Sequence, residues 1–129
     1  MKNKVLCVIL GIALLLPLGS VCVYAYEDDS ELLARAVEAV ASDGSYTVMV
    51  SLASVMLNRL ESDSYPGSLA AVISDAGIDI SAVEPSARAL RASRDALGGF
   101  DPTRGATEYS KSRHDDSPIL LFTDGWCFY

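Results

Sequence analysis

Residues 30–60 read SELLARAVEAVASDGSYTVMVSLASVMLNRL, and this stretch decides the fold class of the chain. Apolar side chains recur in it at the three- and four-residue spacing of an α-helix, first up to Ala41 and again from Tyr46 to Leu60. Asp43-Gly44 lies between the two runs and indicates a turn. We therefore expect two consecutive helices, the second of which has a broad apolar stripe and should lie at the centre of the domain.

The pattern stays helical beyond this stretch and then changes. Leu69 to Ile73 predicts a small helix, and Pro85 suits the first turn of a third main helix that ends at Gly98-Gly99. Three short runs are typical of β-strands, at residues 106–109, 119–122 and 126–129. Helices first and strands last predict an α+β domain, with three main helices followed by a short antiparallel β-sheet.

The N-terminal segment differs from the rest of the chain. Two lysines precede a continuous apolar run over residues 5–16, and Val23-Tyr24-Ala25 has the small-x-small pattern of a signal-peptidase site. Pro17 interrupts the run well short of the roughly 20 apolar residues that span a bilayer. We expect residues 1–25 to be a cleaved signal peptide and residues 26–129 to be the secreted domain, with an uncleaved membrane anchor as the alternative.

The charge of the expected mature domain excludes some classes of partner. The whole chain has 10 Lys and Arg, 17 Asp and Glu and a net charge of −7, and removal of Lys2 and Lys4 would make that charge −9. Nucleic-acid binding is not expected, because phosphate contacts need clustered basic residues. Of the three cysteines only Cys127 lies outside the signal segment, so we expect no disulfide framework, no metal site and no other cofactor.

A series of short motifs resembles one protein family in their order along the chain. The motifs are Leu33-Ala34-Arg35-Ala36-Val37, Leu57-Asn58-Arg59, Tyr65-Pro66, Arg94-Asp95-Ala96-Leu97, Asp101-Pro102-Thr103 and the terminal Phe128-Tyr129. Together they resemble the SleB/CwlJ family of cell wall hydrolases. The resemblance implies a lysozyme-like fold, a bacterial extracytoplasmic location, a peptidoglycan substrate that is the spore cortex in many members, and lytic transglycosylase activity in the SleB branch.

The same resemblance implies that the catalytic acid is missing. Glycosidic cleavage needs a protonated carboxylic acid near the leaving oxygen, and the family carries this Glu in a Tyr-x-Glu-Ala-Arg-Gly-Glu motif at the end of the first helix. Laid on this chain without gaps, the catalytic Glu falls on Val40, the Arg on Ser42 and the second Glu on Gly44. The family's terminal His falls on Trp126, and its Tyr-Asn-Pro segment reads Tyr109-Ser110-Lys111. We expect a retained scaffold with impaired or altered catalysis.

Four residues are candidates for the remaining chemistry. Glu108 is the best acid left, because it lies in the expected first strand, a region with which the family lines its cleft; an ordinary exposed carboxylate is the alternative. Tyr46, Tyr109 and Trp126 are candidates for substrate binding, since aromatic faces suit the apolar side of a pyranose ring. The alternative for these aromatic residues is a place in the core.

Three hypotheses about function therefore stay open. The first is a secreted family member with impaired catalysis that binds a peptidoglycan or muropeptide glycan. The second is an enzyme in which another acid, such as Glu108, has taken over the cleavage. The third is an extracytoplasmic interaction domain with an envelope protein as its partner. In all three, contact with a membrane is expected only through the signal segment, if it is not cleaved.

Overall fold

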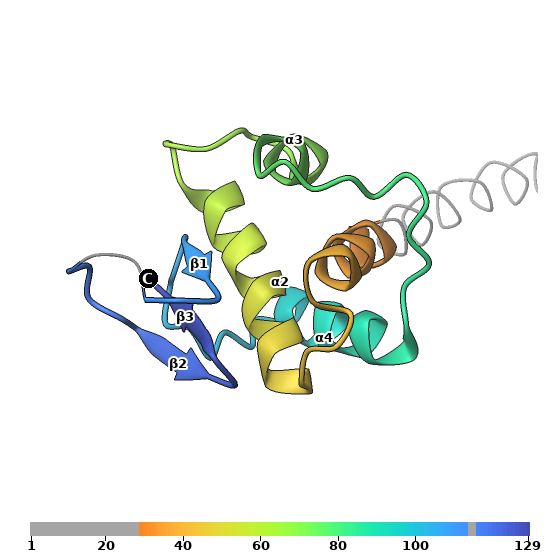
Figure 1. The fold of residues 1–129 in the computed structure, drawn as a ribbon. Helices are drawn as coiled ribbons and strands as arrows, with labels where there is room; N and C mark the ends of the chain where they lie inside the picture. The colour runs from red at the N-terminus through yellow and green to blue at the C-terminus, as the bar shows by residue number, and fades with distance from the viewer. Residues whose placement is uncertain (1–28, 114–115) are drawn as a thin grey trace, which may run out of the picture.

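The structure is a computed structural model that describes residues 29–113 and 116–129 (Figure 1). The expected signal peptide, residues 1–25, lies outside this part of the chain. Within the described residues, no helix combines the length and the apolar character that crossing a membrane requires.

Helices precede strands along the chain, as predicted. The elements are a helix at residues 29–41, α2 (Tyr46–Glu61), α3 (Leu69–Asp75), α4 (Ala87–Leu97), β1 (Tyr109–Ser110), β2 (Leu121–Thr123) and β3 (Trp126–Phe128). This order confirms the α+β fold, with three main helices, one small helix and a short antiparallel sheet.

Several boundaries differ from the prediction. The strand expected at residues 119–122 is β2 at Leu121–Thr123, and two other differences have local reasons. Pro85 lies before the third main helix and not in its first turn, because the Ser86 side chain caps that helix by accepting a hydrogen bond from the backbone N–H of Ala89. Glu108 precedes β1 instead of lying within it. It still exchanges backbone hydrogen bonds with Tyr129, at 3.2 Å and 2.9 Å, so the pairing of the two segments continues past the end of the strand.

The helix α2 is the central element of the fold. Its residues from Val48 to Met56 are buried on every side, which is the pattern of a helix enclosed by other elements. Figure 1 shows the sheet on one side of α2 and α4 on the other. The core around it is built from Leu33 and Val37 of the first helix, Val72 and Ile73 of α3, Ala89, Ala92 and Ala96 of α4, and Phe128 of β3. The predicted central position of the second helix is thus confirmed.

The hairpin between β2 and β3 brings the C-terminal segment back to the start of α2. The strand order in the sheet is β1-β3-β2, with all neighbours antiparallel. The two turn residues, Asp124 and Gly125, have positive φ angles of 48° and 81°, as a two-residue hairpin turn of the primed type requires. This turn sets Asp124 beside Ser45, the N-cap of α2, and places Trp126 next to it in β3.

Candidate active site

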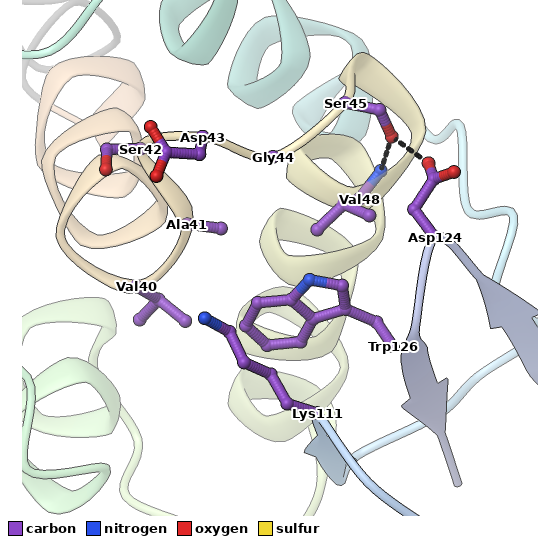
Figure 2. Close-up of a pocket in the computed structure, with 10 residues that line it drawn as sticks. All are labelled: Val40, Ala41, Ser42, Asp43, Gly44, Ser45, Val48, Lys111, Asp124 and Trp126. Atoms are coloured by element: carbon purple, nitrogen blue, oxygen red, sulfur yellow. Dashed lines mark hydrogen bonds between the residues drawn. The ribbon is translucent and has the colours of Figure 1, made fainter.

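A pocket of about 160 Å³ lies where the first helix, the start of α2 and the hairpin meet (Figure 2). Its walls come from three segments far apart in the sequence, namely the turn between the first two helices, the residue after β1 and the β2–β3 hairpin. The lining residues are Val40, Ala41, Ser42, Asp43, Gly44, Ser45, Val48, Lys111, Asp124 and Trp126. The segment on which the resemblance places the catalytic motif, residues 40–44, therefore forms one wall of a pocket.

Val40 occupies this wall at the end of the first helix. Its side chain is half-buried, and Figure 2 shows it facing the same space as Lys111 and Trp126. A branched hydrocarbon at this position offers a ligand an apolar contact and no proton. The carboxylates among the lining residues are Asp43 and Asp124, both exposed.

The turn that follows Val40 is held by the cap of α2. Ser45 Oγ accepts a hydrogen bond from the backbone N–H of Val48 at 3.3 Å and donates one to Asp124 Oδ2 at 2.5 Å. Gly44 is closely confined, since a Cβ there would lie 3.0 Å from the carbonyl oxygen of Ala41 and 3.2 Å from a methyl group of Val48. A glutamate at this position would therefore require the turn to move.

The opposite wall consists of Trp126 and Lys111. Trp126 is only 8% exposed, so it bounds the pocket with a small part of its surface. The ammonium of Lys111 lies 5.1 Å from the centre of a Trp126 ring, within the range of a cation–π contact. The ring of Tyr109 lies 6.1 Å from that of Trp126, tilted by 43°. Burial raises the pKa of the Tyr109 hydroxyl.

Glu108 is not among the residues that line this pocket. Its Oε2 lies 3.2 Å from Nη2 of Arg59, and its other carboxylate oxygen accepts a hydrogen bond from the hydroxyl of Tyr65. That hydrogen bond, followed by burial, raises the pKa of Tyr65. Arg59 is itself 7% exposed, and its Nε donates to the carbonyl of Thr107 at 2.6 Å. The sequence-predicted acid thus belongs to a cluster at the far end of α2.

Tyr46 also lies outside the pocket. Its hydroxyl donates a hydrogen bond to Asp95 of α4, and the guanidinium of Arg91 lies 5.6 Å from the centre of its ring. The hydrogen bond to Asp95 raises the pKa of Tyr46. Of the three aromatic candidates, the structure brings Trp126 to the pocket, sets Tyr109 beside Trp126 and places Tyr46 against α4.

Among the lining residues that the sequence analysis does not identify as site residues are Ser45, Lys111 and Asp124. Ser45 and Asp124 carried a usable signal, since a serine just before an apolar helical run is a typical N-cap and an Asp-Gly pair between two β-runs is a typical hairpin turn. Lys111 stands in the segment that the resemblance aligns with the family's Tyr-Asn-Pro, but its place at the pocket beside Val40 depends on the folded sheet. Among the described residues, no group of three His, Cys, Asp or Glu side chains is arranged to hold a metal ion.

Comparisons with known proteins agree with the resemblance in the motifs. Residues 43–123 match the family model described as cell wall hydrolase. The spore cortex-lytic enzyme of Halalkalibacterium halodurans is 38% identical over 90 residues, which are 64% of this chain and 27% of that protein. The spore cortex-lytic enzyme of Bacillus subtilis is 36% identical over 100 residues, which are 72% of this chain and 32% of that protein. The chain thus spans about a third or less of the length of these relatives.

The fold has solved counterparts. The catalytic domain of the Bacillus cereus SleB protein superposes with a TM-score of 0.66 and 28% identity, covering 78% of this chain and 88% of that domain. The catalytic domain of the germination-specific lytic transglycosylase SleB from Bacillus anthracis gives a TM-score of 0.65 and 28% identity, covering 78% and 92%. The expected lysozyme-like α+β fold is confirmed by these neighbours. By the match over residues 43–123, the chain belongs to the cell wall hydrolase family.

Proposed function

We propose that this chain is an extracytoplasmic protein that binds the glycan of peptidoglycan and cleaves it weakly or not at all. The observation that carries the proposal is Val40, which lines the pocket at the position where the family resemblance requires the acid. The relatives are named for spore cortex lysis and lytic transglycosylation, which supports a peptidoglycan glycan as the ligand. Residues 1–25 would direct the domain across the membrane.

The remaining carboxylates are poorly suited to replace the missing acid. A general acid must lie within hydrogen-bond reach of the leaving oxygen, in surroundings apolar enough to keep it protonated. Asp43 and Asp124 line the pocket but are both exposed, and Asp124 also accepts a hydrogen bond from Ser45. Glu108 is paired with Arg59 and bonded to Tyr65, away from Val40. Loss of a general acid typically lowers the rate by a factor of about 10² to 10⁴, so residual activity should be very small.

Digestion of purified peptidoglycan tests the loss of activity. Soluble muropeptides would be measured by mass spectrometry, which detects both hydrolysed and transglycosylated ends. We expect the wild-type protein to release none above background. Clear turnover that disappears in Glu108→Gln or in Asp124→Asn would contradict the proposal and establish an enzyme with a relocated acid.

Restoring the family residues gives a matched positive control. In the double variant Val40→Glu/Ser42→Arg, both new side chains replace residues that line the existing pocket. We expect weak but measurable release of muropeptides, limited by Trp126 at the position of the family's histidine. If this variant folds and releases nothing, the loss of activity extends beyond the acid to the hairpin.

Binding is tested separately from cleavage. The wild-type protein should sediment with insoluble peptidoglycan, and an excess of soluble glycan fragments should release it. Failure to sediment would instead favour an interaction domain with an envelope protein as partner.

A further inference from the structure

The ammonium of Lys111 is the one cationic group among the residues that line the pocket. Figure 2 shows it extending from the segment after β1 across the Trp126 ring toward Val40, the position of the missing acid. The Nζ atom lies 5.1 Å from the ring centre. A positive charge therefore faces the place where a family enzyme would need a carboxylic acid.

No carboxylate of the described residues forms an ion pair with this ammonium. Asp124 is engaged by the hydroxyl of Ser45 at 2.5 Å. The side chain of Asp43 points away from Lys111 and Trp126 in Figure 2. In Figure 2 the ammonium lies between the indole of Trp126 and the methyl groups of Val40, while the Lys111 residue as a whole is exposed. A ligand that enters the pocket would therefore meet a charge that is reachable from solvent and has apolar groups beside it.

We infer that Lys111 makes this pocket a receptor for a carboxylate on the ligand, so that it selects carboxylate-bearing muramoyl groups over neutral sugars. The inference rests on the proposed glycan binding and specifies which part of the glycan is recognised. N-Acetylmuramic acid is N-acetylglucosamine with an added lactyl ether, and it therefore carries a carboxylate that N-acetylglucosamine lacks. In a muropeptide, the lactyl carboxylate is joined to the peptide stem, which supplies carboxylates of its own.

A tryptophan in the pocket allows binding to be measured by intrinsic fluorescence. Trp126 is the only tryptophan of the chain and lines the pocket, so its fluorescence responds to a ligand near Lys111. Full-length protein would be titrated with four probes: N-acetylmuramic acid, its methyl ester, N-acetylglucosamine and N-acetylmuramoyl-L-alanyl-D-glutamate. The first two differ only in the charge of the lactyl group, and the last distinguishes a lactyl from a peptide carboxylate.

We expect N-acetylmuramic acid or the muramoyl dipeptide to bind more tightly than the ester and N-acetylglucosamine. Lys111→Met keeps a long apolar side chain but removes the charge. It should lower the affinity for the carboxylate probe about two- to fivefold, as expected for a partly exposed ion pair. Arg113→Met is the control. It removes an equal charge two residues further along the chain, at an exposed position that does not line the pocket, and should leave binding of the carboxylate probe unchanged.

Three results would overturn the inference. They are binding of both carboxylate probes no tighter than that of the ester and N-acetylglucosamine, unchanged binding of the carboxylate probes in Lys111→Met, and no response of Trp126 to either carboxylate probe. Sedimentation with insoluble peptidoglycan, run in parallel, separates the two proposals. Retention of the wild type and of Lys111→Met alike, together with any of these results, refutes carboxylate selection and leaves glycan binding in place. Loss of retention in the wild type refutes glycan binding itself.

Discussion

The two ends of α2 differ in how they are connected to the rest of the protein. At its C-terminal end, Asn58 donates hydrogen bonds to Asp101 at 3.0 Å and to the carbonyl of Ala106 at 2.9 Å, and Arg59 binds Thr107 and Glu108. At its N-terminal end, the Tyr46 hydroxyl donates to Asp95 of α4 and Arg88 donates to the carbonyl of Gly44 at 3.1 Å. Ser45 there bonds Asp124 of the β2–β3 hairpin, beside the pocket that Val40 lines. The C-terminal end, here called the fixed end, is thus joined to the segment before β1 through a buried arginine, whereas the N-terminal end, the open end, is joined to the β2–β3 hairpin through Ser45 and borders the candidate site.

The two ends also differ in how they relate to the family resemblance of the sequence. Leu57-Asn58-Arg59 and Asp101-Pro102-Thr103, two of the motifs that resemble the family, belong to the network that joins α2 to the segment before β1. The positions on which the resemblance places the catalytic motif, Val40, Ser42 and Gly44, lie at the pocket. Stability therefore constrains the first set whether or not the protein is an enzyme, while nothing in the fold requires a glutamate at the second.

The largest expected effect of a substitution is at the fixed end. Arg59→Met should lower the free energy of unfolding by about 2–3 kcal/mol, because it removes charge-assisted hydrogen bonds to Thr107 and Glu108 from a buried site. It also removes the guanidinium from between the rings of Tyr65 and Tyr109, at 5.1 Å and 5.7 Å. Urea unfolding measures the change.

Arg59→Lys is the matched control, since it keeps the charge and loses the planar fork that bonds two partners at once. The free energy of unfolding of Arg59→Lys should lie between those of the wild type and Arg59→Met. A loss below about 0.5 kcal/mol for Arg59→Met, the range of an ordinary surface substitution, would show that the two ends of α2 are fixed equally weakly.

The sequence predicted the helices better than the strands for a physical reason. The helices are long, and each carries an apolar stripe that repeats several times, so Tyr46 to Leu60 was predicted to within one residue of α2. The strands are two or three residues long. Their ends depend on pairing across the sheet, as between Glu108 and Tyr129, which no local pattern contains.

The pocket was predictable only in part for a related reason. Val40 could be placed because the family motif lies within one continuous segment. Lys111 and Asp124 reach the pocket through the pairing of β1, β3 and β2, so their position depends on contacts distant in sequence. Glu108 was selected as an acid for the family cleft, but its orientation is set by Arg59 and Tyr65, and the pairing of these side chains could not be deduced from spacing.

A second effect at the fixed end should depend on pH. Burial acts to raise the pKa of Asp101, but hydrogen bonds from Thr103, Asn58 and the backbone of Gly105 lower it by more. The ionised carboxylate therefore stabilises the folded state above about pH 4, and this contribution is lost as the pH falls through the lowered pKa. Asp101→Asn should cost about 1–2 kcal/mol at pH 7 and progressively less in acid.

Urea unfolding of Asp101→Asn at a series of pH values measures this dependence. Asp63→Asn changes an exposed loop residue and serves as the control. Its free energy of unfolding should equal that of the wild type at each pH. A constant difference between Asp101→Asn and the wild type from pH 7 to pH 3 would mean that the carboxylate's charge contributes nothing to the network.

The smallest expected effect is at the open end, where Ser45→Ala removes both the N-cap bond to Val48 and the bond to Asp124. Loss of a serine cap typically costs about 1 kcal/mol, and the exposed bond to Asp124 should add little. Asp124→Asn separates the two bonds, since it keeps the cap and leaves an oxygen acceptor at a position with positive φ that asparagine tolerates. It should therefore be nearly neutral in urea unfolding. If Asp124→Asn destabilises the protein as much as Ser45→Ala, the charge of the Asp124 carboxylate fixes the N-terminal end of α2, and the contrast between the two ends disappears.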